Sequence, residues 1–311
     1  MKLATSASPS PQPIFLAGPT AVGKSAVALE LAQRLGGEII SVDSMQVYRG
    51  LDIGTAKPSR AERSRVPHHL IDVVDVTEPF DAAKFVELAR RAVGEIQSRG
   101  RVPIFCGGTG LYFKAFLEGL GETPPADPRL RAELEATPLP DLLRELENRD
   151  PATFEKIDRQ NSRRVIRAME VIRLTGKPFS TQRADWSHAS GITNPASRFL
   201  CLTRSAADLR ARIDSRVDEM FERGLVEETR RLLARGLAQN RTAMQALGYR
   251  QVIGHLRGER SLADTIELVK VKTRQFAKRQ MTWFRKQPGK KWIELAPEHE
   301  MHVILSRLSL N

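Results

Sequence analysis

Eight residues near the start of the chain have the types and the spacing of a phosphate-binding loop. Gly18-Pro19-Thr20-Ala21-Val22-Gly23-Lys24-Ser25 fits the pattern G-x-x-x-x-G-K-[ST]. In such a loop the backbone N–H groups converge on an anion, and the lysine neutralises the outer phosphates. The hydroxyl of the last residue can bind Mg²⁺. The segment therefore predicts a site for a di- or triphosphate, with Ser25 as the candidate metal ligand.

The segments on either side of this loop are those that the motif requires. The apolar run Ile14–Ala17 precedes the loop and is typical of a buried strand. Lys24–Leu35 follows it, with apolar residues at helical spacing. Strand, glycine loop and helix in this order place the N-terminus of a helix behind the bound anion. A glycine turn before an ordinary helix is the alternative, and both flanking elements argue against it.

Acidic residues follow two further apolar runs. Asp43 comes directly after the run Glu38–Val42. In P-loop folds an acid at such a strand end lies beside the phosphate site, so Asp43 is a candidate Mg²⁺ ligand, general base or turn residue. Asp72 and Asp75, in and after the run His69–Val74, are alternative acids for the same place.

The apolar run Val102–Cys106 ends in a second glycine-rich loop, Gly107-Gly108-Thr109-Gly110. Without side chains at the glycines, the backbone and the Thr109 hydroxyl can approach a ligand closely. A plain turn between a strand and a helix is the alternative interpretation. We expect this loop to face the phosphate-binding loop.

The alternation of strand-like and helical segments predicts an α/β fold with a mostly parallel sheet that contains the P-loop. Ligands of such sheets bind at the carboxyl ends of the strands, where all three loops begin. A helix is expected over Ala82–Gln97. The expected strands are Ile14–Ala17, Glu38–Val42, His69–Val74, Val102–Cys106, Phe199–Thr203 and Lys291–Leu295.

The composition changes at Gly119–Pro128, where Gly, Pro and Asp cluster. We predict a flexible tail over residues 1–13, a P-loop core domain from 14–125 and 197–311, and an all-helical insertion domain over 126–196. The last part of the core domain is also expected to be helical. Its helices are predicted over Ala206–Arg223, Leu225–Arg235, Ala243–Leu256 and Leu262–Lys286.

The chain is strongly basic, with 49 Lys and Arg against 37 Asp and Glu and a net charge of +12. The segment Lys270–Lys291 carries no acid, and Lys270, Arg274 and Lys278 are spaced to share one helix face. A positive stripe of this kind suits a nucleic-acid backbone, whereas a solvated basic helix is the alternative. A second basic group lies in the expected insertion and comprises Arg159, Arg163, Arg164, Arg167 and Arg173.

Other signals exclude several classes of protein. Cys106 and Cys201 lie in apolar runs, which is typical of buried thiols in a reducing compartment. His68-His69 has no third ligand at the spacing of a metal site. Residues 1–13 lack the apolar region of a signal peptide, and no segment has the length of a transmembrane helix. We therefore expect a cytoplasmic protein without a membrane partner, and a monomer, since no feature demands a second subunit.

The motifs occur in an order that resembles the tRNA dimethylallyltransferases, the bacterial enzymes that prenylate an adenosine beside the anticodon. The resemblance runs from about residue 14 to residue 293. The segments that carry it are Gly18–Ser25, Asp43–Gln46, Gly107–Tyr112, Ala243–Tyr249 and Thr273–Gln280.

This resemblance implies transfer of a dimethylallyl group from dimethylallyl diphosphate to N6 of the adenosine 3′ to the anticodon in tRNA, with Mg²⁺ as cofactor. The P-loop would then hold a leaving diphosphate, whose growing negative charge its preorganised donors stabilise. Asp43 matches the family's base, which accepts a proton from the attacking amine or orients it, and Thr109 is expected to reach the leaving group. The adenosine must be extruded from the anticodon loop to reach such a site.

The resemblance also implies which residues bind each substrate. The residues expected to bind diphosphate are Gly18, Pro19, Thr20, Ala21, Val22, Gly23, Lys24, Ser25 and Arg216. The residues expected to contact tRNA are Asp43, Ser44, Met45, Gln46, Thr109, Arg131, Arg163, Arg164, Val165, Ile166, Arg167, Arg274, Lys278 and Arg279. The chain departs from the family's usual Gln-Arg pair, which here reads Arg163-Arg164.

Three other functions fit part of the sequence. A prenyltransferase acting on free adenine nucleotides would use the same chemistry but does not need two basic modules. A P-loop kinase or ATPase needs an arginine finger or a lid, of which the sequence gives no sign. A non-catalytic RNA-binding protein leaves the P-loop and Asp43 without a purpose.

Overall fold

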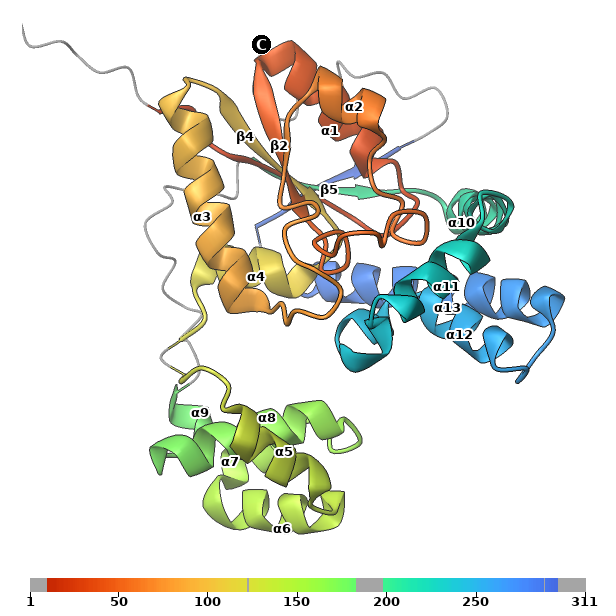
Figure 1. Cartoon of the computed structure of the whole chain (residues 1–311). Helices are drawn as coiled ribbons and strands as arrows, with labels where there is room; N and C mark the ends of the chain where they lie inside the picture. The colour runs from red at the N-terminus through yellow and green to blue at the C-terminus, as the bar shows by residue number, and fades with distance from the viewer. Residues whose placement is uncertain (1–9, 122, 183–197, 288, 296–311) are drawn as a thin grey trace, which may run out of the picture. The chain divides into compact units, whose positions relative to one another are not determined.

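One sheet of six parallel strands carries the glycine-rich loops at its carboxyl edge (Figure 1). The computed structural model describes residues 10–121, 123–182, 198–287 and 289–295. The strand order is β3-β2-β4-β1-β5-β6. The strands are β1 (Ile14–Ala17), β2 (Gly37–Val42), β3 (His68–His69), β4 (Val102–Gly107), β5 (Phe199–Thr203) and β6 (Lys291–Glu294). The predicted parallel α/β sheet is therefore confirmed.

The register aligns the ends of the three central strands. Ala17 at the end of β1 pairs with Gly107 at the end of β4. Gly107 in turn pairs with Val42 at the end of β2. The P-loop, the segment after Asp43 and the second glycine loop therefore leave the sheet at the same level.

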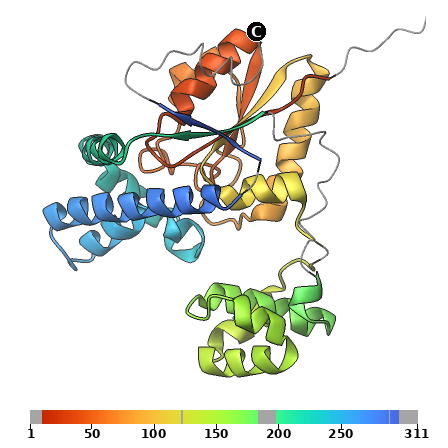
Figure 2. The same ribbon diagram turned by 180° about the vertical axis from the view of Figure 1, so that it is seen from behind.

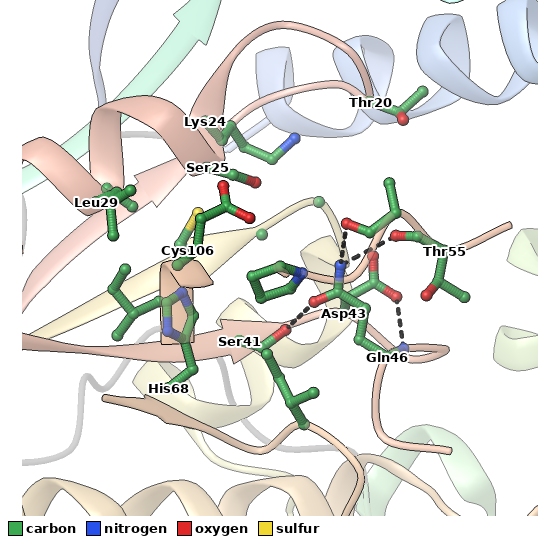
Figure 3. Close-up of a pocket in the computed structure, with 18 of the residues that line it drawn as sticks. Thr20, Lys24, Ser25, Leu29, Ser41, Asp43, Gln46, Thr55, His68 and Cys106 are labelled. Carbon is green, nitrogen blue, oxygen red and sulfur yellow. Dashed lines mark hydrogen bonds between the residues drawn. The ribbon is translucent and has the colours of Figure 1, made fainter. Parts of the chain in front are cut away.

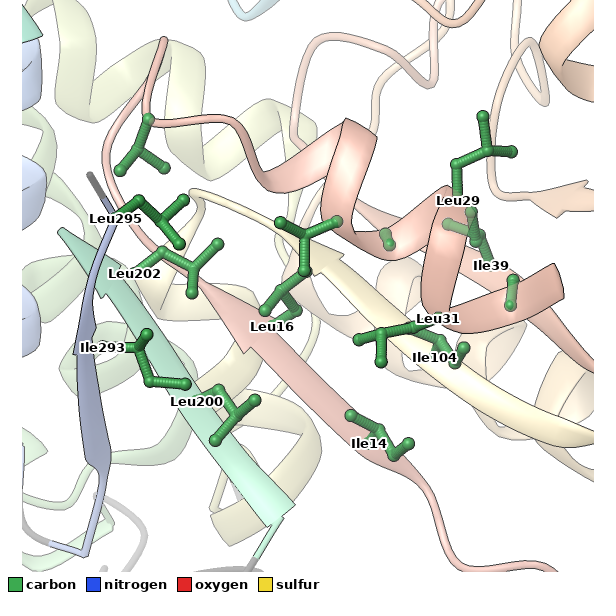
Figure 4. Packing of buried hydrophobic residues seen from close by; sticks show 14 of the residues in the cluster. Ile14, Leu16, Leu29, Leu31, Ile39, Ile104, Leu200, Leu202, Ile293 and Leu295 are labelled. Atoms are coloured by element: carbon green, nitrogen blue, oxygen red, sulfur yellow. The ribbon is translucent and has the colours of Figure 1, made fainter. Parts of the chain in front are cut away.

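The sheet is buried on both faces, as parallel sheets with helices on each side are. On one face Leu16, Ile39 and Ile104 pack with α1 (Lys24–Leu35) in an aliphatic core (Figure 4). Because successive side chains of a strand point to opposite faces, Phe15 lies on the other face. There its ring stacks on Phe105, with the ring centroids 4.9 Å apart.

Further helices surround the sheet (Figures 1 and 2). They are α2 (Arg60–Arg65), α3 (Ala82–Ser98) and α4 (Gly110–Glu118), followed after β5 by α10 (Ala206–Glu222), α11 (Leu225–Ala234), α12 (Tyr249–Leu256) and α13 (Leu262–Arg285), with short 3₁₀ turns at Leu237–Gln239 and Ala243–Gln245. The long helix α13 contacts α10 and α12. Among the described residues no helix combines the length and the apolar character needed to cross a membrane.

Two predicted elements differ from the structure. In place of the strand expected over His69–Val74, the structure has the two-residue strand His68–His69. Leu70 and Asp72 adopt φ angles of 61° and 57°, which turn the chain out of the sheet. The helix expected over Ala243–Leu256 is interrupted at Gly248, whose φ is 91°. The helix α12 therefore starts only at Tyr249.

The chain divides into two compact units, Met1–Lys114 with Ile192–Asn311, and Ala115–Gly191. In the second unit Val165 and Met169 of α8 lie in a small apolar core with Leu142 and Leu146 of α6. Its helices after α4 are α5 (Pro128–Ala136), α6 (Leu139–Arg149), α7 (Pro151–Lys156), α8 (Ser162–Thr175) and α9 (Phe179–Gln182). An independent domain over 126–196 stays a prediction, and of the tail predicted over 1–13, residues 1–9 lie outside the described residues.

Candidate active site

The P-loop has the backbone of an anion cradle. Gly18 and Gly23 have φ angles of 151° and 108°, and a Cβ at Gly18 would lie 2.7 Å from the carbonyl oxygen of Leu202. Gly23 is the N-cap of α1, so the first turn of the helix faces the loop. The Nζ of Lys24 donates to the carbonyl of Pro19 at 2.6 Å. Burial lowers the pKa of Lys24 to about 8, because the protein solvates the charged amine poorly. An anion bound beside this amine would stabilise its charged form.

Side chains that are distant in the sequence hold the P-loop in place. Arg204 donates to the carbonyl of Val22 at 2.8 Å, and Arg212 donates to that of Ala21 at 3.0 Å. Gln280 of α13 accepts from the Thr20 N–H at 2.8 Å and donates to the Gly108 carbonyl at 3.0 Å. Gln280 thus joins the two glycine loops. The sequence motifs do not reveal this role, although Gln280 ends the Thr273–Gln280 motif.

Close packing of α13 explains two glycines of the second loop. A Cβ at Gly108 would lie 2.2 Å from the side-chain nitrogen of Gln280. A Cβ at Gly110 would lie 2.2 Å from the ring of Trp283. The second glycine loop is therefore a surface on which α13 packs as well as a wall of the site.

Asp43 lies at the turn that follows β2 (Figure 3). Its Oδ1 accepts from the N–H of Met45 at 2.8 Å and from that of Gln46 at 3.3 Å. Among the described residues its Oδ2 has no hydrogen-bond donor. The carboxylate is thus fixed in orientation by one oxygen while the other stays available as a proton acceptor.

The alternative acids are engaged elsewhere. Asp72 pairs with Lys57 at 2.5 Å and with Arg63 at 2.8 Å. Asp75 pairs with Arg235 at 2.8 Å. Neither lines the cavity of the P-loop, so the structure favours Asp43 over both of them.

Two cavities meet at Asp43. The first, which we name the P-loop cavity, is lined by Thr20, Lys24, Ser25, Leu29, Ile39 and Cys106 as well as by Asp43. The second, named the Met45 cavity, is lined by Ser44, Met45, Thr109, Gly248 and Arg279. Asp43, Thr20, Thr55, Arg216 and Phe276 border both. The predicted approach of Arg216 to the P-loop agrees with this position.

Thr109 lies on the side of the Met45 cavity and does not border the P-loop cavity. Its Oγ1 accepts from the Ser44 N–H at 3.2 Å. This position favours a contact with the molecule that enters the Met45 cavity over the expected contact with a leaving diphosphate.

Both polar atoms of the Gln46 side-chain amide form hydrogen bonds. Its Oε1 accepts from the Ser41 hydroxyl at 2.9 Å, and its Nε2 donates to the carbonyl of Thr55 at 3.1 Å. The loop that carries Thr55 is anchored in turn by a buried carboxylate. Glu228 accepts from the N–H groups of Asp52 and Ile53 at 3.2 and 2.9 Å, and from the Tyr249 hydroxyl at 2.5 Å.

The basic face expected on α13 is partly neutralised by α10. Lys270 pairs with Asp218 at 2.8 Å, and Arg274 pairs with Asp214 at 2.5 Å. The prediction of an uninterrupted positive stripe through Lys270, Arg274 and Lys278 is therefore wrong, since acids from another helix lie against it. Lys278 and Arg279 are exposed.

In the helical unit the expected tRNA-contacting residues fall into two groups. Arg163 and Arg164 are exposed on α8, whereas Val165 is fully buried and Ile166 packs against the same core. Val165 therefore cannot offer its side chain to RNA. Arg131 and Arg167 both pair with the buried carboxylate of Glu170, at 2.6 and 2.5 Å.

A family model described as IPP transferase matches residues 46–287 of the chain. The chain belongs to the IPP transferase family. It is 45% identical over 287 residues to the tRNA dimethylallyltransferase 1 of Trichlorobacter lovleyi, covering 91% of this chain and 93% of that protein. It is 47% identical over 287 residues to the tRNA dimethylallyltransferase of Geobacter metallireducens, covering 90% and 92%.

Solved structures agree with this membership. The tRNA isopentenylpyrophosphate transferase of Bacillus halodurans is 39% identical to this IPP transferase, with a TM-score of 0.68 over 96% of this chain and 97% of that chain. A eukaryotic dimethylallyltransferase acting on tRNA is 30% identical, with a TM-score of 0.77 over 92% of this chain and 74% of that chain. The resemblance found in the sequence motifs is thus confirmed.

Proposed function

We propose that this IPP transferase moves the dimethylallyl group of dimethylallyl diphosphate to N6 of the adenosine 3′ to the anticodon in tRNA and releases diphosphate. One observation carries the proposal. Asp43, with an oxygen to which no described residue donates, lies where the P-loop cavity meets the Met45 cavity. A base in that place faces a leaving group on one side and an acceptor on the other.

The reaction follows from this arrangement. The lone pair of N6 attacks the allylic carbon from the Met45 cavity, so that a nitrogen–carbon bond forms as the carbon–oxygen bond to diphosphate breaks. The electron pair of that bond leaves with the diphosphate, and a proton of N6 passes to Oδ2 of Asp43. Because Oδ1 is already bonded to two backbone N–H groups, the carboxylate needs no reorientation before the proton transfer.

The P-loop stabilises the leaving group. Negative charge on the diphosphate grows as the carbon–oxygen bond breaks, and fixed backbone donors with Lys24 and Arg216 lower the energy of that state. Since Arg204, Arg212 and Gln280 already hold the backbone of the P-loop, the loop needs little reorganisation during the reaction.

The residues around the P-loop fit a Mg²⁺ ion held mainly by the substrate. Ser25 is exposed, and its hydroxyl has no hydrogen-bond partner among the described residues. The described part of the chain holds no cluster of three His, Cys, Asp or Glu side chains that would form a protein cage. Mg²⁺ commonly keeps several waters and binds through phosphate oxygens and one or two protein ligands, which here would be Ser25. When bound, the ion would neutralise charge on the diphosphate.

Recognition of tRNA would use the cations beside the Met45 cavity. Arg279 lines that cavity, and Lys278, the preceding residue of α13, is exposed. Arg163 and Arg164 of the helical unit would bind RNA phosphates as well. We further propose a cytoplasmic protein, because tRNA is found in that compartment, and a monomer, as expected from the sequence.

A labelling experiment tests the proposal. The protein is incubated with Mg²⁺, labelled dimethylallyl diphosphate and either an unmodified tRNA anticodon stem-loop or AMP. Label in the RNA alone is the expected result. Label in AMP alone would instead show an adenylate prenyltransferase. ATP hydrolysis without any prenyl transfer would show a P-loop ATPase.

A further inference from the structure

Two arginines bind successive carbonyl groups of the P-loop. The Nε of Arg212 donates to the carbonyl of Ala21 at 3.0 Å, and the Nε of Arg204 donates to the carbonyl of Val22 at 2.8 Å. Arg212 lies on α10, and Arg204 directly follows the last residue of β5. Two neighbouring peptide groups of the loop are therefore each bonded to a guanidinium at their oxygen end.

Each of these bonds fixes the direction of one N–H group. In a trans peptide group the C=O and N–H bonds point in opposite directions, and the described residues contain no cis peptide bond. Because the Ala21 carbonyl is turned toward Arg212, the N–H of Val22 points away from Arg212. In the same way, the bond from Arg204 to the Val22 carbonyl turns the N–H of Gly23 away from Arg204. The two arginines thus determine which side of the loop carries the donors.

The N–H groups of Val22 and Gly23 are available to a ligand. Among the described residues neither of them has a hydrogen-bond acceptor. Val22 is fully buried, and a buried N–H without an acceptor is rare in folded proteins. Gly23 is the N-cap of α1, so its N–H lies at the end of a helix where anions bind. A bound anion is the acceptor that suits both groups.

The backbone of the loop needs outside contacts to keep this arrangement. Ala21 has a φ of 63°, in the left-handed region that disfavours residues with a Cβ. Such a conformation persists where the surrounding structure holds it, and it is found preferentially at functional sites. The bond from Arg212 is made to the carbonyl of this same residue, so it opposes rotation of the peptide group that follows Ala21.

The two arginines differ in how their charge is compensated. The side chain of Arg204 is 11% exposed and pairs with Asp208 at 2.8 Å, four residues before Arg212 on α10. Arg212 is exposed and pairs with no acid in the described part of the chain. A cation at the oxygen end of a peptide dipole favours the same orientation as an anion at its hydrogen end. The charge of Arg212 and a bound diphosphate therefore stabilise the same peptide orientation.

We propose that Arg204 and Arg212 are positioning residues of the leaving-group site, which bind P-loop carbonyls and thereby direct the N–H groups of Val22 and Gly23 to the diphosphate. This inference rests on the proposed function, in which the P-loop holds the leaving group. Neither arginine touches the substrate in this role. Each acts on a different donor: Arg212 on the N–H of Val22, and Arg204 on that of Gly23.

An NMR titration tests each arginine against its own N–H group. The amide signals of Val22 and Gly23 are followed while the full-length protein is titrated to saturation with inorganic diphosphate and Mg²⁺. An amide proton that donates to a phosphate oxygen shifts downfield, so both signals should shift in the unmodified protein. In Arg212→Ala the shift of Val22 should be lost and that of Gly23 retained. Arg204→Ala should have the opposite effect.

Binding and turnover are measured on the same variants. We expect each substitution to raise the Kd for inorganic diphosphate by about tenfold or more, because a hydrogen bond to a charged group is lost. The single-turnover rate with dimethylallyl diphosphate should decrease by about a hundredfold, since the lost donor contributes most when charge develops on the leaving group.

Arg223→Ala is the matched control for the loss of a positive charge. Arg223 borders the same surface cavity as Arg212 but has no hydrogen bond to the described residues of the P-loop. Its replacement should retain both amide shifts and keep the Kd for diphosphate close to that of the unmodified protein. If Arg204→Ala does not fold by thermal melting, the titration of Arg212→Ala decides the question alone, because it distinguishes between the two amides.

Three outcomes would overturn the proposal. Both amide shifts retained in Arg212→Ala with a weaker Kd would show that Arg212 binds the diphosphate directly. Loss of both shifts in that variant at saturation would show that it does not act on one peptide group. The absence of both shifts in the unmodified protein would remove these N–H groups from the site. By contrast, both shifts in an unmodified protein that transfers no dimethylallyl group to RNA would overturn the proposed function alone.

Discussion

The side-chain oxygen of Gln280 lies 2.8 Å from the backbone nitrogen of Thr20, so a residue of the last long helix closes on the P-loop 260 positions earlier in the chain. The amide nitrogen of the same side chain bonds the Gly108 carbonyl at 3.0 Å. One side chain therefore sets the distance between the two glycine loops. Helix α13 is thus a third wall of the phosphate site.

Replacing Gln280 by Ala should weaken the binding of dimethylallyl diphosphate. Loss of two partly buried hydrogen bonds, each contributing about 1 kcal/mol, should raise the KM for the diphosphate by about ten- to thirtyfold with a smaller effect on kcat. Gln275→Ala, on an exposed position of the same helix, is the control. A KM unchanged in Gln280→Ala would show that the bridge does not order the P-loop.

Asp43→Asn should abolish proton transfer but keep the turn, because the amide oxygen can still accept from Met45 and Gln46. We expect the single-turnover rate to fall by about a hundredfold or more, the usual contribution of a general base. Binding of tRNA should persist. Asp75→Asn, which changes a paired acid away from the cavity, should keep its rate. Turnover of Asp43→Asn near that of the unmodified enzyme would remove Asp43 from the role of base.

The pKa of Lys24 predicts how catalysis depends on pH. Burial places this pKa at about 8, and only the protonated amine attracts the diphosphate. The kcat/KM for dimethylallyl diphosphate should therefore be level below pH 8 and decrease about tenfold per pH unit above it. Measurement at saturating tRNA isolates this step. The decrease should be absent in Lys24→Arg, since arginine stays protonated over this range. A profile that is level to pH 10 in the unmodified enzyme would contradict the assignment.

The cations of α13 should differ in their contribution to RNA binding. Replacing exposed Lys278 and Arg279 by Ala should weaken tRNA binding, and it should reduce the slope of log K against log[salt] by about 0.7 to 0.9 for each RNA phosphate that the protein no longer neutralises. Lys270→Ala is the matched control, because Lys270 is already paired with Asp218 and Glu267. Filter binding between low and moderate salt provides the slopes. Equal slopes for both variants would mean that α13 does not bind the RNA backbone.

Tyr249→Phe should loosen the loop that carries Thr55. The tyrosine hydroxyl donates to Glu228 and accepts from the N–H of Gly54 at 3.0 Å, so its removal leaves a buried carboxylate oxygen short of a donor. We expect a loss of about 1–3 kcal/mol in the free energy of unfolding. Hydrogen exchange at the amides of residues 52–54 should become faster. Exchange that stays as slow as in the unmodified protein would show that the loop is ordered by other contacts.

Local sequence was sufficient for the parts of the site that are contiguous in the chain. The P-loop, its strand Ile14–Ala17 and its helix Lys24–Leu35 have the bounds expected from motif and periodicity. Asp43 was placed correctly at the end of β2 because strand and acid are adjacent. Each of these features depends on residues only a few positions apart.

Features that depend on distant residues could not be predicted in this way. Gln280 meets Thr20 only because α13 folds across the carboxyl edge of the sheet. The acids Asp214 and Asp218 of α10 pair with the basic face of α13. The number of unpaired cations on α13 therefore cannot be predicted from the sequence of α13 alone. The run His69–Val74 has the composition of a strand, but positive φ angles at Leu70 and Asp72 decide its path.

The alignment of Ala17, Val42 and Gly107 in the sheet limits which substitutions the active site can accept. A Cβ at position 107 would lie 2.1 Å from the carbonyl oxygen of Val42, so any side chain there would push apart the last rung of the sheet. The distance between Asp43 and the P-loop would then increase, since each of them follows one of these strand ends. In a redesign of this enzyme, loop residues other than the tightly packed glycines Gly18, Gly108 and Gly110 can be exchanged for new donors or acceptors, whereas the three strand ends must keep their positions.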